Sequence, residues 1–529
     1  MTTRRSVLAG GLALAAMPGV ARGQRLAADP RTAPKPAREV AIAGGPDGAF
    51  SGDTVNGVHR FLGVRYGRAE RFRAPVRASH EGEIVPANEF SAMAPQRGNG
   101  AQSEDCLKLN IWTPTILASA PKRPVMVYIH GGAYSGGTVT VPLNDGETLA
   151  RTEDVVVVTV NHRLNAFGYL YLARLDPRFP DSGNLGQLDL ILALEWIRDN
   201  IAAFGGDPGR VFVFGQSGGG AKIATLMGMP AAKGLFHSAA TMSGQQVTAS
   251  GPMNATRRAQ AYLAKLGVKE SDLSPLLDMP MERLVEALDA TDPILGGGVY
   301  FGPVLDMKWL TRHPFWPDAN PQSLHIPMIL GNTHDETRAF VSPDSPKVKG
   351  LTWDNLAAAM APELRMDLLP EWIVGEYRAH FPNDTPEQIF YRATTAGRSW
   401  PGQVIEADAR AAAGAKATWV YQVDFQSPIP GRGAPHTMDI ALAFGTLGAQ
   451  GSFTGTGPEA QRLSRQVMAA FAALARTGKP VAKGVPAWPA YTLPKRATML
   501  FDVNSRAVND PRKWERELFA RVPYIQPGS

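Results

Sequence analysis

Three unbroken apolar runs lie in the first half of the chain, at residues 125–129, 155–160 and 211–214. None of them shows the polar alternation of a strand that has one face in water. Such runs are typical of parallel strands buried on both faces. The first run stops at two glycines and the third at glycines around a serine. We therefore expect these runs to be core strands of a sheet.

Helical periodicity separates the second and third runs. Leu190, Leu194, Ile197 and Ile201 recur at the spacing of one helix face, and the small residues after the third run can start another helix. Strand, helix and strand in this order predict a mostly parallel α/β sheet. Ligands of such sheets bind at the carboxyl ends of the strands, where the glycine clusters and the serine fall.

The remaining sequence predicts one catalytic domain, residues 39–529, with helical insertions. Residues 39–115 are rich in short β signals. Residues 251–325 and about 340–415 are amphipathic, helical and interrupted by proline, and they could cap the active end of the sheet. Further strands and a last long helix are predicted at residues 326–331, 418–425 and 459–478. No repeat or low-complexity break divides the domain.

Residues 1–23 have the features of an export signal. Arg4 and Arg5 precede a short apolar stretch, and small residues precede a cleavage position after Gly23. The paired arginines resemble the twin-arginine type, which carries folded proteins across a membrane. The apolar stretch is shorter than the roughly 20 residues that span a bilayer. We expect a periplasmic or secreted protein with no stable membrane insertion after signal removal, and a linker at residues 24–38.

The composition excludes several classes of function. Hydrophobic residues make up 44% and charged residues 19% of the chain, as in soluble globular proteins. Without the predicted signal, 51 basic residues face 48 acidic ones, and this net charge of +3 is too small to favour nucleic acid or a membrane surface. Cys106 is the single cysteine, so no internal disulfide can form. No cluster has the spacing of metal ligands, and no metal or cofactor is expected.

Residues 215–219, GQSGG, place Ser217 between a predicted strand and a predicted helix. A nucleophile on such a sharp turn needs small residues two positions to either side, and we predict that Ser217 is one. Residues 130–134, HGGAY, end an earlier strand and are typical of a loop that offers backbone donors to an oxyanion. The predicted donors are the amides of Gly132, Ala133 and Gly218.

A serine nucleophile needs a histidine base and an acid that orients it, in the chain order serine, acid, histidine for this kind of sheet. Of the ten histidines, four precede Ser217 and His237 follows it too closely. His436 follows the strand-like residues 418–425 through a Gly/Pro loop and is the predicted base. Asp335 and Glu336 both follow the predicted strand 326–331, and the residue pattern leaves both open as the acid.

Several longer stretches make the chain resemble the type B carboxylesterase family, which includes bacterial para-nitrobenzyl-type esterases, mammalian carboxylesterases and cholinesterases. They are FLGVRYG, SEDCLKLNIWTP, VYIHGGAYSGG, VNHRLNAFGYL, GNTHDET and GAPHTMDIALAFG, together with the stretch around Ser217. The resemblance implies an α/β-hydrolase fold and hydrolysis of small carboxylic esters without a cofactor. It also assigns the acid to Glu336 and places Ser243 close behind the triad, with a hydrogen bond into it.

Two departures from the family bear on function. Gln216 stands where cholinesterases carry a glutamate that faces a cationic substrate, which argues against choline esters. Gly218 stands where alanine is usual, but only its backbone amide is used. Two alternatives stay open: a non-catalytic binding protein of the same fold, and a hydrolase of amides, carbamates or lactones. The presence of serine, acid, base and donor loop together favours the esterase.

Overall fold

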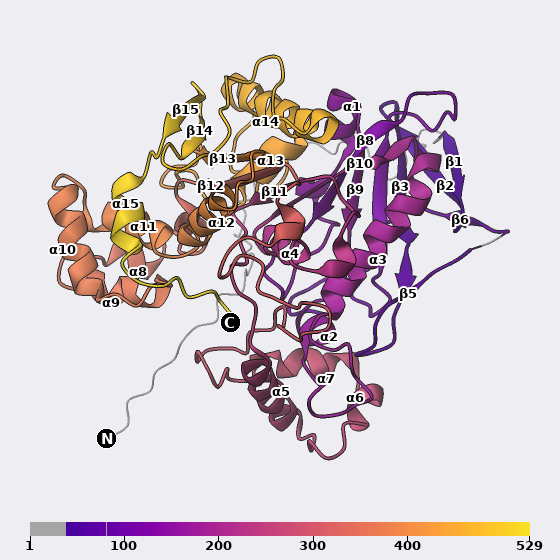
Figure 1. Cartoon of the computed structure of the whole chain (residues 1–529), viewed down its shortest axis with the longest axis horizontal. Coiled ribbons are helices and arrows are strands. Elements are labelled where there is room, and N and C mark those ends of the chain that lie inside the picture. The colour runs from indigo at the N-terminus through magenta and orange to yellow at the C-terminus, as the bar shows by residue number, and fades with distance from the viewer. Residues whose placement is uncertain (1–38, 81, 529) are drawn as a thin grey trace, which may run out of the picture.

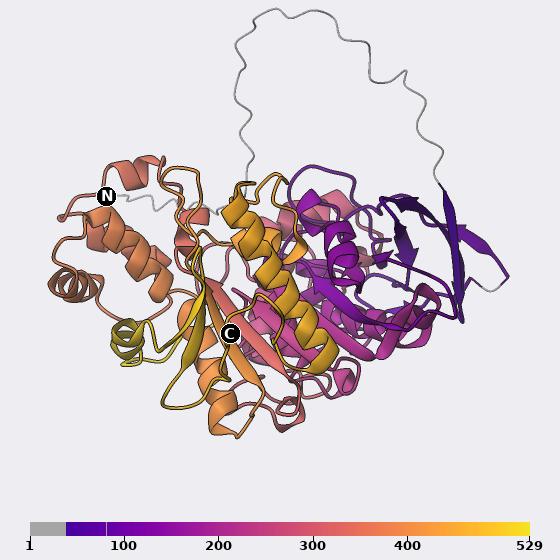
Figure 2. The same ribbon diagram turned by 90° about the horizontal axis from the view of Figure 1, so that it is seen from above.

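The computed structural model describes residues 39–80 and 82–528. The predicted signal and linker therefore lie outside the described residues. A sheet of 13 strands forms the centre of the described chain, and helices cover both of its faces (Figure 1). Seen from above, the long helix α14 lies along one face of the sheet (Figure 2).

The large sheet has the spatial strand order β1-β2-β3-β7-β9-β8-β10-β11-β12-β13-β14-β15, with β6 beside β2. The strands from β9 to β14 in this order are parallel to their neighbours, and antiparallel strands flank them at both ends. The strands are β1 Val40–Gly45, β2 Gly48–Val55, β3 Val58–Arg65, β6 Ile84–Pro86, β7 Lys108–Thr113, β8 Arg123–Ile129, β9 Val156–Val160, β10 Gly206–Gln216, β11 Ser238–Met242, β12 Met328–Thr333, β13 Thr418–Val423, β14 Ala497–Phe501 and β15 Arg506–Asn509. Two short strands, β4 Gly67–Arg68 and β5 Val76–Arg77, pair separately.

The helices connect these strands and form the insertions. They are α1 Glu147–Glu153, α2 Asn165–Tyr169, α3 Leu185–Asn200, α4 Gly218–Leu226, α5 Pro252–Leu266, α6 Pro275–Asp278, α7 Met281–Glu286, α8 Pro346–Lys349, α9 Leu356–Met360, α10 Pro370–His380, α11 Pro386–Ala396, α12 Trp400–Ala412, α13 Met438–Phe444, α14 Pro458–Thr477 and α15 Lys513–Phe519. Within the described residues, no helix combines the length and the apolarity needed to cross a bilayer.

The central strands are buried on both faces, as the apolar runs predicted. In β8, Val125, Val127 and Ile129 pack into one hydrophobic core together with α3, while Met126 and Tyr128 pack into a second core together with α13 and α14. The sheet thus separates two apolar layers, and each strand must be apolar at successive positions. The prediction of a mostly parallel α/β sheet with helices on both faces is confirmed.

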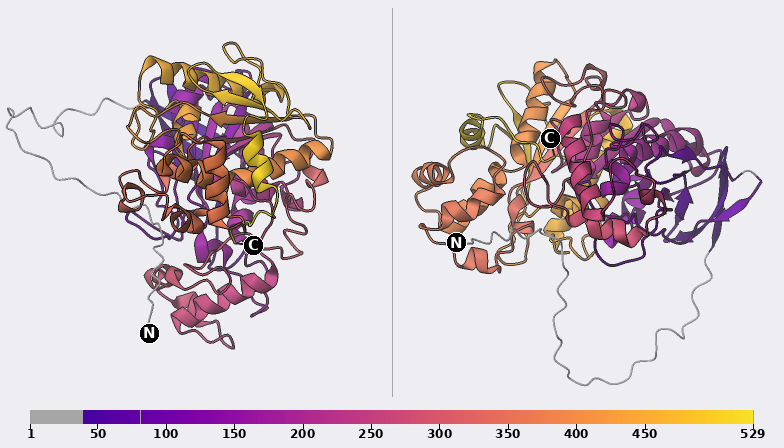
Figure 3. Two further views of the ribbon diagram at one scale, coloured as in Figure 1. Left: turned by 90° about the vertical axis from the view of Figure 1, so that its left-hand side faces the viewer. Right: turned by 90° about the horizontal axis from the view of Figure 1, so that it is seen from below.

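The insertions form two groups that lie apart. Helices α5 to α7 gather at one end of the molecule, whereas α8 to α11 gather elsewhere, beside α15 (Figures 1 and 3). The second group has its own core, which includes Leu356, Ile373, Phe390 and Phe519. Residues 290–320 are largely irregular rather than helical, because three consecutive glycines and several prolines interrupt them.

Candidate active site

Ser217 occupies a strained turn between β10 and α4. Its φ of 56° and ψ of −125° lie in a region that residues other than glycine rarely adopt. The turn is also crowded by backbone: a Cβ on Gly219 would lie 2.0 Å from the carbonyl oxygen of Ile129, and one on Gly215 would lie 2.6 Å from the carbonyl carbon of Gly219. The glycines flanking Ser217 are therefore required by direct contact between the strand and the helix.

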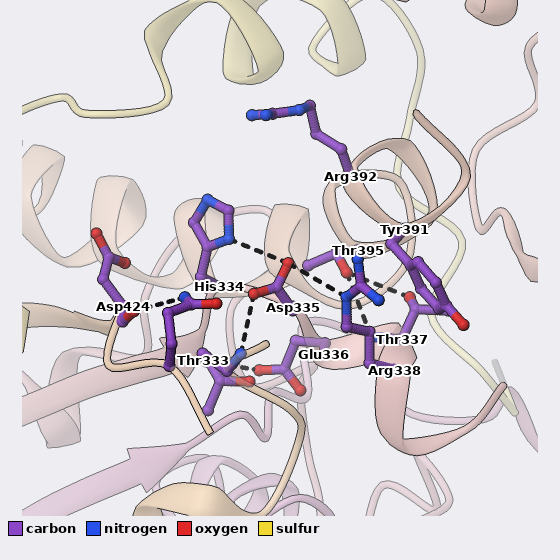
Figure 4. A network of polar contacts seen from close by, with 12 residues as sticks. Thr333, His334, Asp335, Glu336, Thr337, Arg338, Tyr391, Arg392, Thr395 and Asp424 are labelled. Atoms are coloured by element: carbon purple, nitrogen blue, oxygen red, sulfur yellow. Dashed lines mark hydrogen bonds and ion pairs between the residues drawn. The ribbon is translucent and has the colours of Figure 1, made fainter. Parts of the chain in front are cut away.

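Glu336 and His436 form a buried pair. The carboxylate of Glu336, 1% exposed, accepts a hydrogen bond from Nδ1 of His436, 5% exposed. The other carboxylate oxygen accepts hydrogen bonds from the Ser243 hydroxyl at 2.6 Å and from the backbone N–H of Thr333 at 2.8 Å. Figure 4 shows the carboxylate of Glu336 beside Thr333. Each of its oxygens thus has at least one donor.

The charge state of Glu336 follows from these contacts. Burial alone would raise the pKa of its carboxyl group, but the neighbouring His436 and the hydrogen bonds from His436, Ser243 and Thr333 outweigh burial and lower the pKa. Glu336 is therefore a carboxylate at neutral pH, and it assigns the proton of neutral His436 to Nδ1. Nε2 of His436 then carries a lone pair that can accept a proton.

Asp335 serves a different purpose from its neighbour. Its carboxylate accepts a hydrogen bond from the N–H of Ala434 at 2.9 Å, and its own N–H donates to the carbonyl oxygen of Ala434 at 2.9 Å. It lies between His334, 3.3 Å away, and Arg338, 3.9 Å away (Figure 4). Asp335 thus fixes the segment that carries His436, whereas Glu336 contacts the imidazole itself. The residue pattern did not decide which carboxylate contacts the predicted base. The geometry shows that it is Glu336.

The imidazole of His436 also contacts two side chains that sequence reasoning did not assign to it. The ring of Phe340 lies 4.8 Å from it, centroid to centroid, and is tilted by 42°. The side-chain amide nitrogen of Gln216 lies 3.1 Å from Nε2. Across the part of the chain that the structure describes, no hydrogen bond joins the Ser217 hydroxyl to His436. The structure therefore brings acid and base together and places the Gln216 amide against the imidazole ring, 3.1 Å from Nε2 and 3.4 Å from Nδ1.

The predicted oxyanion loop lies directly against the start of α4. Gly132 and Ala133 have φ values of 93° and 52°. The carbonyl oxygen of Ala133 is so close to Gly218 that a Cβ on Gly218 would lie 2.0 Å from it. Gly218 is the first residue of α4, so its N–H has no partner within the helix. The three residues with predicted donor amides are thus neighbours in space.

Possible metal ligands lie scattered in the described part of the chain. Within residues 39–80 and 82–528, no three or more His, Cys, Asp or Glu side chains gather as they would around a metal ion. Cys106 is buried and free, and burial raises the pKa of its thiol to about 12. Serine, imidazole and carboxylate are the groups that this site offers for chemistry.

Comparison with known proteins finds carboxylesterases among the chains similar to this one. The model of the carboxylesterase family matches residues 37–519. The chain is 34% identical to the para-nitrobenzyl esterase of Bacillus subtilis, over 89% of this chain and 96% of that protein. It is 30% identical to the acylcarnitine hydrolase of Rattus norvegicus, over 83% and 82% of the two chains.

Solved structures agree with the sequence comparison. The crystal structure of a carboxylesterase from Geobacillus stearothermophilus superposes with a TM-score of 0.80 and 34% identity, over 90% of this chain and 99% of that chain. A para-nitrobenzyl esterase structure superposes with a TM-score of 0.76, also at 34% identity and over the same shares. The resemblance inferred from the sequence motifs and the predicted α/β-hydrolase fold are both confirmed.

Proposed function

Since the chain belongs to the carboxylesterase family and is a serine hydrolase of carboxylic esters, we propose that Ser217 is its nucleophile, His436 its general base and acid, and Glu336 the acid that orients the base. The observation that carries this proposal is the buried hydrogen bond from Nδ1 of His436 to Glu336. It fixes the tautomer in which Nε2 can accept the serine proton.

The proposed reaction has two halves. Nε2 of His436 takes the proton of Ser217 as the hydroxyl oxygen attacks the ester carbonyl, and it gives that proton to the departing alcohol. Water then attacks the acyl-enzyme by the same route in reverse. The amides of Gly132, Ala133 and Gly218 stabilise the oxyanion of each tetrahedral intermediate. Glu336 stabilises the imidazolium that forms in both halves.

Gln216 lies against the imidazole of the proposed base. Its amide nitrogen lies 3.1 Å from Nε2 and 3.4 Å from Nδ1 of His436, so it contacts the imidazole ring away from the direction of the Nε2 lone pair. The lone pair of Nε2 is therefore free of Gln216 and can receive the proton of Ser217. Catalytic hydrogen bonds are often long before a substrate is present, which agrees with the absence of a Ser217–His436 hydrogen bond within the described residues. Ser243 supports the site through its hydrogen bond to Glu336.

We propose neutral esters of simple alcohols as the substrates. Gln216 is 1% exposed and uncharged, so the residue before the nucleophile offers no carboxylate to a cationic alcohol group. The relatives named above include a para-nitrobenzyl esterase and an acylcarnitine hydrolase, whose names cover both a neutral and a cationic alcohol. The charge of the alcohol group is therefore the property of the substrate to test.

Matched esters give a direct test of this substrate class. We expect p-nitrophenyl acetate, butyrate and octanoate to be hydrolysed with an initial burst of p-nitrophenol equal to the enzyme concentration, and butyrylcholine to be hydrolysed with a kcat/KM at least about tenfold lower than that of p-nitrophenyl butyrate. Stopped-flow and steady-state assays measure both. A choline ester that is hydrolysed as fast as its neutral partner would contradict the assignment of neutral esters.

We also propose that the protein is exported, on the basis of Arg4, Arg5 and the apolar stretch that follows them. Expression in a bacterium with a functional twin-arginine pathway should yield a periplasmic protein that begins at Gln24. The intact mass of that protein measures the cleavage position. Retention of residues 1–23 in a cytoplasmic product, with the same result for a variant in which both arginines are replaced by lysine, would refute export.

A further inference from the structure

Lys222 is a fully buried lysine in α4, five residues after Ser217. Its ammonium group donates to the carbonyl oxygen of Ala133 at 2.7 Å and to that of His130 at 3.4 Å, and it lies 5.2 Å from the ring centroid of Tyr134. Within the described residues, no carboxylate forms an ion pair with it. Burying a charge without a counter-ion is unfavourable. The contacts of the Lys222 ammonium group must therefore offset this free-energy cost.

All of these contacts fall on the loop 130–134, which carries two of the proposed oxyanion donors. Ala133 has the left-handed φ of 52°. Its carbonyl oxygen lies directly against Gly218, the first residue of the helix that contains Lys222. Lys222 therefore ties the loop with two proposed donors to the helix with the third. By fixing the carbonyl of Ala133, it also limits the rotation of that strained residue.

The side chains around Lys222 are neutral at neutral pH. His130, just after β8, and His162, just after β9, have ring centroids 4.7 Å apart and are tilted by 31°. Burial, with a smaller contribution from the nearby Lys222, lowers the pKa of His130 to about 3 and that of His162 well below its usual range. Three of their four ring nitrogens have no hydrogen-bond partner in the described structure. Burial also raises the pKa of the Tyr134 phenol well above its usual range.

The neighbouring helix α3 supplies no charge to the cluster either. Its Gln187 donates a hydrogen bond to the carbonyl oxygen of Lys222 at 3.1 Å. The buried charges on α3 and on the segment after β9, Asp189 and Arg163, pair with each other at 2.7 Å. Burial lowers the pKa of Lys222 to about 7. Lys222 is thus the group of this cluster that gains or loses a proton close to neutral pH.

We propose that Lys222 is a positioning residue that holds the oxyanion loop through the carbonyl of Ala133, and that it holds the loop more firmly when protonated. A charge-assisted hydrogen bond is roughly twice as strong as a neutral one. Deprotonation should therefore loosen the loop and lower the rate of acyl transfer. The inference rests on the proposed function, because it assigns Gly132, Ala133 and Gly218 as oxyanion donors.

Protonation of Lys222 should affect stability and activity in opposite directions. The pKa in the folded protein, about 7, lies below the value of about 10.4 for an unfolded lysine. Between these values the unfolded chain binds more protons, so stability rises with pH. Activity should fall over the same range as the loop loses its charged support. A merely structural lysine would not produce this divergence.

The test compares wild type, K222M and K233M, the last being the same substitution at an exposed lysine in the same region. For p-nitrophenyl butyrate we expect the kcat of the wild type to decline between pH 7 and pH 9 while its Tm rises. K222M should have a kcat about tenfold lower at pH 6.5, a KM within about twofold, no alkaline decline and an unreduced Tm. The tenfold loss is smaller than the 10²- to 10³-fold loss of a direct donor. K233M should match the wild type.

The wild-type profile alone can overturn the proposal, even if K222M does not fold. A wild-type kcat that stays constant from pH 7 to pH 9 overturns the role of Lys222 and leaves the ester hydrolase intact. A K222M enzyme with unchanged kcat, or with a lower kcat that keeps the alkaline decline, overturns it as well. If the wild type hydrolyses no ester at any pH, the proposed function fails first and the inference fails with it.

Discussion

Replacing Ser217 by alanine is expected to lower kcat for p-nitrophenyl acetate by about four to six orders of magnitude. Alanine keeps the Cβ atom and the strained backbone of the turn but removes the oxygen that would form the acyl-enzyme. The Tm should change little, because the Ser217 hydroxyl makes no hydrogen bond within the described residues. Steady-state assays at high enzyme concentration measure the residual rate, and thermal unfolding checks the fold.

Ser243 provides a matched control for this variant. It shares the left-handed backbone of Ser217, with φ of 52° against 56°, but its hydroxyl donates to Glu336 instead of attacking the substrate. Ser243→Ala should lower kcat by about tenfold, the range expected when one hydrogen bond to a charged group is lost. A Ser217→Ala enzyme that retains more than a few per cent of wild-type kcat would show that the nucleophile lies elsewhere.

Glu336→Gln is expected to lower kcat by about four orders of magnitude, as loss of the orienting carboxylate does in serine hydrolases. The amide carries no charge to stabilise the imidazolium, and its NH₂ group can reverse the tautomer of His436. Asp335→Asn, the same change at the adjacent position, should cost only about tenfold, because Asp335 holds the backbone of Ala434 and not the imidazole. The ratio of the two kcat values measures which carboxylate orients the base.

The opposite order of these effects would reassign the acid. If Asp335→Asn were the more damaging change, the Glu336–His436 contact would be a stabilising pair and not part of the catalytic machinery. Glu336 also contributes to stability. Its pKa is lowered by folding, so this contribution is present above the unfolded pKa of about 4.3 and is lost as the pH falls through the folded pKa.

Most of the sheet could be predicted because its buried strands appear in the sequence as runs of apolar residues. Unbroken apolar runs marked β8, β9, the end of β10, and β12. Three strands, β11, β14 and β15, escaped the prediction for physical reasons. β11, Ser238–Met242, is fully buried but is built from small and polar residues, and Ser243 after it was recognised only through the family. β14, Ala497–Phe501, and β15, Arg506–Asn509, follow the last predicted helix, in a Pro-rich part of the chain for which no strand was predicted.

The chemistry of the site was predictable where it depends on local pattern. Ser217 and the loop at 130–134 stand at strand ends with glycines that the turns require. The residue pattern alone could not choose between Asp335 and Glu336, and only the family resemblance assigned Glu336. Both residues follow the same strand, and the path of the distant segment 427–436 decides which one meets His436. Lys222 went unassigned for a related reason, since a single lysine among small residues reveals its burial only when the loop from β8 packs on it.

Reaction with a fluorophosphonate tests the central claim most directly. The wild-type protein should gain one covalent phosphonyl group per chain, and the modified residue should be Ser217 in the peptide that follows β10. Ser217→Ala should remain unlabelled under the same conditions, and Ser243→Ala should still react. Intact-protein mass spectrometry measures the number of phosphonyl groups per chain, and peptide mapping identifies the modified residue. Stoichiometric labelling at another residue, or no labelling of a folded wild-type protein, would contradict the account.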